Sequence, residues 1–388
     1  MSEDQKGPAL TTDPAPGAPD PDAILIATRR GIEQVRTKAA DYSFNELFDM
    51  YRSEELLIDP AYQRAFRWSE EKQSQFIESL ILELPIPPLY VMEVKDGQYE
   101  LIDGLQRFSS YLHFRGELRK DGEKQPPLQL IGCDIVSAIN ELSYSQLPTA
   151  LQIRIKRMTV PVQILRKESD AKARYHMFKR LNRGGEVLSD QEVRNATIRL
   201  LGTTFNDFLR DLAKSPHFAT CTEIMTDADK DQMAREECVL RFFAFKNNRA
   251  KYVKLIRPFL DSFMEQVTEA KLAFDFKEER RVFESTFRFF ANVTGEQSFS
   301  SVGRRGTPTN QFSQSQFDML SLGIQRDLPK LEDMVLADPG GVKEKLEGLK
   351  KDEEFLKAVG GGGKNYQAAY SRAIDLVERR IRTWLPTA

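Results

Sequence analysis

Cysteine is scarce in this sequence of 388 residues, which has three in all and no Cys-x-x-Cys pair. A disulfide framework needs paired cysteines and a zinc site needs closely spaced ones, so the sequence argues against both. The sequence also has no apolar run long enough to cross a membrane and no signal peptide. We therefore expect a cytoplasmic protein in a reducing compartment, with no membrane partner.

Histidine is equally rare, and the three histidines are His113, His176 and His217. Metal-dependent nucleases and Ser/His hydrolases need histidines grouped with suitable partners, and no such group is present. We predict that His113 and His176 are packed or surface residues of helices. An excess of positive charge is also absent, because the net charge is −2. Any contact with nucleic acid therefore needs a local basic patch.

The chain is long enough for two domains, and its 40% hydrophobic and 29% charged residues are those of an ordinary globular protein. Residues 1–22 are rich in proline, glycine and acids, which predicts a disordered tail. Residues 23–204 mix helical and strand patterns, whereas residues 205–388 show helical spacing. The predicted fold class is α+β, with a mainly α-helical C-terminal domain.

Local signals place the elements of the first domain. An Asp-Gly turn at 96–97 predicts a hairpin, and serines 43, 69, 145 and 189 are predicted helix caps. The predicted strands are 89–94, 98–102, 128–135 and 159–165, the last with a proline that suggests an edge or a bulge. The predicted helices include 23–40, 105–114, 145–158 and 167–181. A polar loop is predicted at 298–313.

One corner of this domain has features of an anion site. The run Asp103-Gly104-Leu105-Gln106-Arg107 follows a predicted strand and opens a predicted helix. Asp103 can cap that helix or help to hold a metal, and Gly104 allows a sharp turn close to a ligand. Gln106 and Arg107 would leave the first turn beside backbone N–H groups, a place that suits a phosphate. The alternative is a capped helix that binds nothing, with Arg107 solvated.

A second polar segment runs from Tyr62 to Trp68. Its Gln63, Arg64 and Arg67 are suited to hold phosphate by hydrogen bonds and guanidinium forks, and an aromatic neighbour can stack on a base. The alternative is that the aromatic residues belong to the core and the arginines pair with the acids that follow.

The third polar segment lies between two predicted helices. The run Asn182-Arg183-Gly184-Gly ends one helix, and Ser189-x-x-Glu192 is a capping box that opens the next. Backbone N–H groups beside such a glycine loop can face an anion, although glycine after a helix is also the usual C-cap.

Together, these three segments and the connecting run 78–88 resemble the DUF262 family, the N-terminal domain of GmrSD-type modification-dependent restriction proteins. The resemblance spans about residues 43–200. It implies a ParB/sulfiredoxin-like fold that binds an NTP with Mg²⁺ and that couples this activity, in defence proteins, to the recognition of modified DNA. A homo-oligomer and the identity of any metal ligand are left open.

The family's Asp-Gly-Gln-Gln-Arg motif is matched here except that Leu105 replaces its first glutamine. Leucine can neither hydrogen-bond phosphate nor position a water, so binding is expected to survive and hydrolysis to be weak. The catalytic candidates that the resemblance implies are Asp103, Gln106 and Arg107. The nucleotide-binding candidates are Gln63, Arg64, Arg67, Gly104, Asn182, Arg183, Gly184 and Arg194.

Many relatives continue into an HNH-type nuclease, but residues after 200 contain only His217 and no nuclease constellation. A separate nuclease or effector protein is therefore an expected partner, together with DNA. The leading hypothesis is a nucleotide-binding module of a DNA-directed restriction system. The alternatives are a DNA-binding module without catalysis and an adaptor whose helical part docks an effector subunit.

Overall fold

The computed structural model describes residues 20–33, 36–58, 66–120, 123–182, 189–302, 308–359 and 367–385. Residues 1–19 of the predicted tail lie outside these ranges. The candidates Gln63, Arg64, Arg183 and Gly184 lie outside them too, and of Asn182 only the backbone is described. The predictions for these residues stay predictions.

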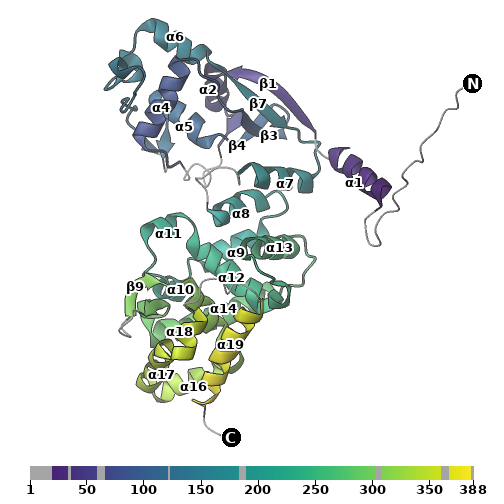
Figure 1. Ribbon diagram of the computed structural model, residues 1–388, viewed down its shortest axis with the longest axis vertical. Helices are drawn as coiled ribbons and strands as arrows, with labels where there is room; N and C mark the ends of the chain where they lie inside the picture. The colour runs from purple at the N-terminus through teal and green to yellow at the C-terminus, as the bar shows by residue number, and fades with distance from the viewer. Residues whose placement is uncertain are drawn as a thin grey trace, which may run out of the picture.

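A five-stranded mixed sheet organises the N-terminal part (Figure 1). Its strands, in spatial order, are β1 (Thr37–Ser43), β7 (Thr159–Leu165), β3 (Leu89–Lys95), β4 (Gln98–Asp103) and β2 (Leu56–Leu57). The pairs β1–β7 and β3–β4 are antiparallel, whereas β7–β3 and β4–β2 are parallel. The mixed α and β fold and the hairpin at 96–97 are therefore confirmed. The ParB/sulfiredoxin-like relationship stays a prediction.

Helices cover both faces of this sheet, and the alternation of strand residues explains how. Val91, Leu101 and Ile164 face one core, which the first group of helices completes. Their neighbours Met92, Ile102 and Leu165 face a second, smaller core together with Phe178 of α7 (Ala171–Asn182). The first group comprises α2 (Phe44–Arg52), α4 (Glu70–Ile81), α5 (Leu105–Phe114) and α6 (Thr149–Arg157).

Three of the four predicted helix caps are confirmed, whereas the cap at Ser145 is wrong, because α6 begins at Thr149 with Pro148 as its N-cap. The hydroxyl oxygens of Ser43, Ser69 and Ser189 each accept a backbone N–H from three residues ahead, at 3.1, 3.3 and 3.2 Å. Ser189 and Glu192 form a full capping box at the start of α8 (Asp190–Ile198). These caps satisfy N–H groups that a helix start leaves without an intrahelical acceptor.

Two predicted elements are wrong, and a third is confirmed in its bounds but not in its place. The helix predicted over 23–40 ends at Glu33 as α1 (Pro21–Glu33), and β1 follows it. The strand predicted over 159–165 is confirmed as β7, but it lies inside the sheet between β1 and β3 and pairs without a bulge, so the edge or bulge that Pro161 suggested is wrong. Residues 128–135 form no strand, because side chains take up backbone groups that a ladder would use: Glu78 accepts from the N–H of Ile135, at 2.9 Å.

Beyond residue 200 the described chain is helical apart from one hairpin, β8 (Ser300–Val302) and β9 (Pro308–Phe312), where a polar loop was expected. The helices share one large aromatic core. They are α9 (Thr204–Leu212), α10 (Pro216–Cys221), α11 (Asp227–Asp231), α12 (Ala234–Asn248), α13 (Ile256–Thr268), α14 (Phe276–Val293), α15 (Gln314–Gly323), α16 (Leu328–Ala337), α17 (Pro339–Lys351), α18 (Glu353–Val359) and α19 (Gln367–Arg382). That they form a separate domain stays a prediction.

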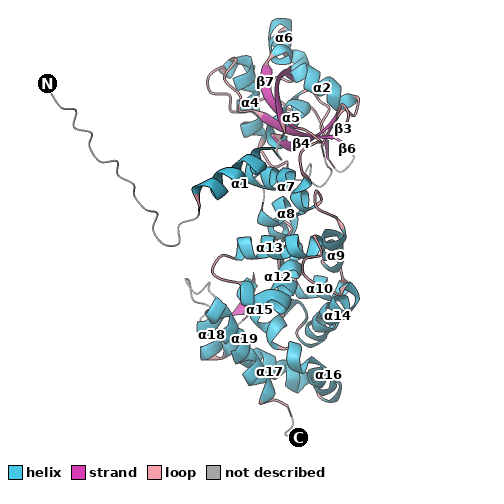
Figure 2. Ribbon diagram, turned by 90° about the vertical axis from the view of Figure 1, so that its right-hand side faces the viewer, coloured by secondary structure: helices cyan, strands magenta, loops and turns pink. Residues whose placement is uncertain are grey.

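The minor elements are short. A two-stranded ribbon pairs β5 (Arg119–Lys120) with β6 (Glu123–Lys124). The 3-10 helices are η1 (Ser137–Ile139), η2 (Tyr144–Gln146), η3 (Arg249–Lys251), η4 (Gly295–Gln297) and η5 (Gln325–Asp327). No helix in the described part of the chain is long and apolar enough to span a membrane. The helices α7 and α8 lie between the sheet and the helical part (Figures 1 and 2).

Candidate functional site

The corner between β4 and α5 is a tight turn built on Gly104. This residue is the N-cap of α5 and has a φ of +102°, a conformation that side chains with a Cβ rarely adopt. The prediction that Asp103 caps the helix is wrong, because its carboxylate accepts from Arg107 Nη2 instead, at 3.0 Å. The sharp turn is confirmed. The residue that leaves no room for a Cβ at Gly104 is Leu89, at the start of β3, and not a ligand.

Arg107 is held rather than solvated. Besides its pair with Asp103, its guanidinium donates to the carbonyl oxygen of Pro88 from both terminal nitrogens, at 3.2 Å each, and to that of Pro87. Arg107 therefore links α5 to the segment that leads into β3. Burial raises the pKa of Asp103, although the charge of Arg107 and the N–H of Gly104 both favour its ionised form.

Gln106 connects the corner to the second polar segment. Its Oε1 accepts the backbone N–H groups of Arg67 and Trp68, at 3.0 and 3.1 Å. One amide oxygen thus fixes the backbone of two consecutive residues that are nearly forty positions away in sequence. This contact places the side chain of Arg67 beside the start of α5.

Arg67 connects the second segment to the third. Its guanidinium forms two hydrogen bonds with the carboxylate of Glu192, at 2.6 and 3.2 Å. The partner in this pair is Glu192 and not Glu70 or Glu71, the acids that follow in sequence and that the alternative interpretation proposes. Glu192 is only 6% exposed and also accepts the backbone N–H of Ser189, at 2.7 Å. Gln106, Arg67 and Glu192 therefore join all three polar segments in one place.

Two hydrophobic residues of these segments are part of the core. Trp68 packs against the first core and lies edge-on to Phe76, which favours packing over base stacking. Leu105, which departs from the family's motif, is buried in the same core. A glutamine in this conformation would point into apolar surroundings, so Leu105 does not remove a polar group from the surface of the corner.

Comparison with known families decides what this arrangement belongs to. Residues 44–199 match the family described as GmrSD restriction endonuclease, N-terminal domain. Residues 44–199 are a GmrSD-type N-terminal domain. The match covers all described residues of the three polar segments that line the corner. Searches of curated proteins and of solved structures gave no match.

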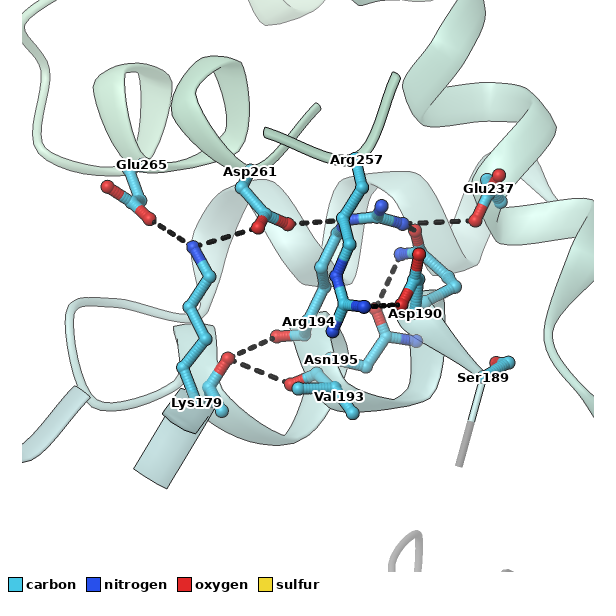
Figure 3. Close-up of polar contacts among 12 residues, drawn as sticks. Lys179, Ser189, Asp190, Val193, Arg194, Asn195, Glu237, Arg257, Asp261 and Glu265 are labelled. Carbon is cyan, nitrogen blue, oxygen red and sulfur yellow. Dashed lines mark hydrogen bonds and ion pairs between the residues drawn. The ribbon is translucent and has the colours of Figure 1, made fainter. Parts of the chain in front are cut away.

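The last helix of the GmrSD-type domain, α8, carries the candidate Arg194, which Figure 3 shows among acidic residues of the helical part. Arg194 is 3% exposed and bonds to Asp261 of α13 at 2.8 Å and to Glu237 of α12 at 3.0 Å. Lys179 of α7 reaches the same Asp261 at 3.0 Å. Arg194 is therefore a buried joint between the GmrSD-type domain and the helical part, and we leave it out of the proposed ligand site.

No cluster of metal ligands is present in the part of the chain that the structure describes, in the sense of three or more His, Cys, Asp or Glu side chains together. Asp103 stands as a single, half-exposed carboxylate at the corner. His113 is packed, as predicted, with its ring nitrogens 2.7 Å from Gln73 Oε1 and 3.0 Å from the carbonyl oxygen of Pro126. Any Mg²⁺ at the corner would depend on oxygens of a bound ligand.

Two ion pairs of the GmrSD-type domain were not predicted from the sequence. Glu192 was recognised as a capping acid, but its pairing with Arg67 was missed. Arg199, at the end of α8, pairs with Glu100 of β4 at 3.2 Å and holds the helix to the sheet. Opposite charges in separate motif segments were the only signal for either pair, and such charges are too common to select one partner.

Proposed function

We propose that this protein is the nucleotide-binding module of a DNA-directed restriction system, with the NTP held by the corner of its GmrSD-type domain. One observation carries the proposal. The guanidinium fork of Arg67 holds a carboxylate at the place where all three polar segments of the family meet. A fork that binds a carboxylate through two hydrogen bonds also suits a phosphate.

In this proposal Glu192 occupies the position that a phosphate would take. Arg67 is 28% exposed, so a ligand reaches its guanidinium from solvent, whereas Glu192 lies on the buried side of the pair. Gln106 orients Arg67 through its backbone, and Arg107 holds the corner to the segment before β3. If the phosphates bring a Mg²⁺, the carboxylate of Asp103 would accept a hydrogen bond from one of the waters on that ion.

Hydrolysis is proposed to be weak. Phosphoryl transfer depends on residues that position a water and neutralise charge at the γ-phosphate. Arg107 is engaged by Asp103 and by two carbonyl groups, so it is not free to neutralise charge at a γ-phosphate. The corner therefore favours binding over turnover. DNA and a separate effector are proposed as partners of the helical part.

Arg67→Ala is expected to weaken NTP binding about tenfold or more, because it removes one charge-assisted bidentate contact to phosphate. Fluorescent ATP, GTP and CTP, titrated with Mg²⁺ and followed by anisotropy, measure this. Arg154→Ala is the matched control, since Arg154 pairs with Glu83 on the exposed surface of the same domain. Its affinity should equal that of the unchanged protein. Absence of saturable binding of every NTP to the unchanged protein would remove the proposal.

The same titration with DNA distinguishes the alternative of a DNA-binding module without a nucleotide. DNA binding that falls steeply with salt and does not respond to any NTP would favour that alternative. DNA binding that changes when NTP is added supports the nucleotide-binding module.

Glu192→Gln is expected to raise NTP affinity several-fold, which is the opposite direction from Arg67→Ala. The substitution weakens the internal pair with which a phosphate competes, while glutamine retains the role of a capping-box acceptor. Asp190→Asn makes the same charge change in the first turn of α8, but Asp190 pairs with Arg257 instead. If both variants raise the affinity equally, only the general charge matters and Glu192 does not compete with the nucleotide.

A further inference from the structure

Lys350 of α17 differs from the other buried lysine and arginine side chains of the described chain, because no carboxylate pairs with it. Four lysine or arginine side chains are buried there, and three of them, Lys179, Arg194 and Arg241, contact carboxylates within the protein. Lys350 is 5% exposed and has no carboxylate within ion-pair distance among the described residues. Its described acceptor is the carbonyl oxygen of Gln297 in η4, at 2.5 Å. An ammonium group has three N–H donors, so this contact satisfies it only in part.

Lys350 faces a small pocket between α17, η4 and β8. The pocket has a volume of about 120 Å³, and two more lysines of α17, Lys343 and Lys351, line it. Neither of these lysines forms an ion pair with a described residue, and Glu347 is the one acid in the lining. Three amino groups thus surround one pocket that a single carboxylate cannot neutralise.

The surroundings of Lys350 disfavour its charge. Burial lowers its pKa to about 8, and the negative charge of Glu347 opposes this only in part. From the opposite wall, Thr294, Gln297 and Val302 line the pocket without carrying a charge. A buried ammonium group is stabilised when an anion accompanies it, and no described residue provides one within ion-pair distance of Lys350.

We propose that this pocket binds a small oxyanion of the phosphate or sulfate class, with Lys350 as the buried ligand and Lys343 and Lys351 at the entrance. The volume fits one tetrahedral oxyanion and excludes a nucleotide, whose sites are several times larger. The site is separate from the corner of the GmrSD-type domain and does not depend on the function proposed for that corner.

Calorimetric titration with sodium sulfate tests this site on the full chain. Sulfate keeps its charge across the range used, so any linked proton belongs to the protein. The unchanged protein should bind one sulfate at this pocket, and Lys350→Met should weaken this binding at least tenfold. At pH 8 binding should take up about half a proton, because the anion favours the ammonium form of a group with a pKa of about 8. At pH 6.5 the uptake should be close to zero, since Lys350 is already protonated.

Two control variants make the outcome decisive. Lys345→Met removes the same charge from α17 at a residue outside the pocket lining, and it should leave sulfate binding unchanged. Arg67→Ala removes the other proposed anion ligand, so its sulfate binding at the Lys350 pocket should persist. The proposal is overturned if Lys350→Met binds sulfate like the unchanged protein, or if binding is lost in Arg67→Ala alone. It is also overturned if no saturable binding exceeds that of a chloride titration at equal ionic strength. Circular dichroism verifies that Lys350→Met is folded.

Discussion

Arg194→Met is expected to lower the free energy of unfolding by about 3–5 kcal/mol, because it removes a buried cation from the buried carboxylate of Asp261. Arg194 is 3% exposed and lies between Asp261 of α13, which is 6% exposed, and Glu237 of α12, which is 28% exposed. Methionine fills similar space but offers no donor. Lys179 still contacts Asp261, which keeps the loss within this range rather than above it.

Urea denaturation followed by fluorescence measures the effect in both parts of the chain, because its two tryptophans lie one in each. Trp68 packs against the sheet core, and Trp384 packs against the helical core. Arg257→Met is the matched control: Arg257 pairs with Asp190 between the same two helices at 2.9 Å, but both side chains are more than a third exposed. Its cost should stay below about 1 kcal/mol. Equal losses in the two variants would show that burial of Arg194 contributes nothing.

A second variant separates the charge from the space that it fills. Arg194→Met combined with Asp261→Asn removes both members of the closest pair, so part of the lost stability should return. We also expect the two tryptophans of the single variant to report separate transitions, since Arg194 is a joint between the two parts. If both tryptophans instead report one transition, at a lower urea concentration than in the unchanged protein, Arg194 is not the contact that joins the two parts.

Features that depend on a few neighbouring residues could be predicted from the sequence. Ser43, Ser69 and Ser189 cap helices because the acceptor and the N–H group are three residues apart. The hairpin at 96–97 follows from a dipeptide in which glycine takes a positive φ, here +73° at Gly97. The three polar segments were recognised as one family pattern, and the family match over 44–199 confirms it.

Features that depend on distant partners could not be predicted. The run 128–135 has the composition of a strand, but Ser74 and Glu78 of helix α4 accept hydrogen bonds from its N–H groups. Arg194 is a residue type that often binds phosphate and follows a polar motif segment. Only the packing of α8 against α12 and α13 shows that carboxylates surround it. Whether an arginine meets a phosphate or a buried acid is decided by tertiary contacts that no local pattern encodes.

The corner itself depends most on its glycine, so Gly104→Ala is expected to destabilise the protein by about 2–5 kcal/mol. An L-residue at a φ of +102° costs about 1–2 kcal/mol, and forcing extra volume into a packed core costs a further 1–3 kcal/mol. A Cβ at Gly104 would lie 2.1 Å from Leu89 Cδ2, and Leu89 is fully buried. The side chain of Leu89 must therefore move, and the added Cβ would also lie 3.4 Å from Nη2 of Arg107.

Gly97→Ala isolates the backbone part of this effect, because Gly97 also has a positive φ but no atom lies within 4 Å of its added Cβ. Only the backbone strain, about 1 kcal/mol, should appear there in thermal or urea unfolding. NTP affinity should fall in Gly104→Ala and stay unchanged in Gly97→Ala, since only the first adds an atom beside the guanidinium of Arg107. Equal destabilisation by the two substitutions would mean that the Leu89 side chain moves aside at little cost in free energy. Gly104 would then matter for its backbone conformation alone, and the tight packing of the corner would not be what holds Arg107 in place.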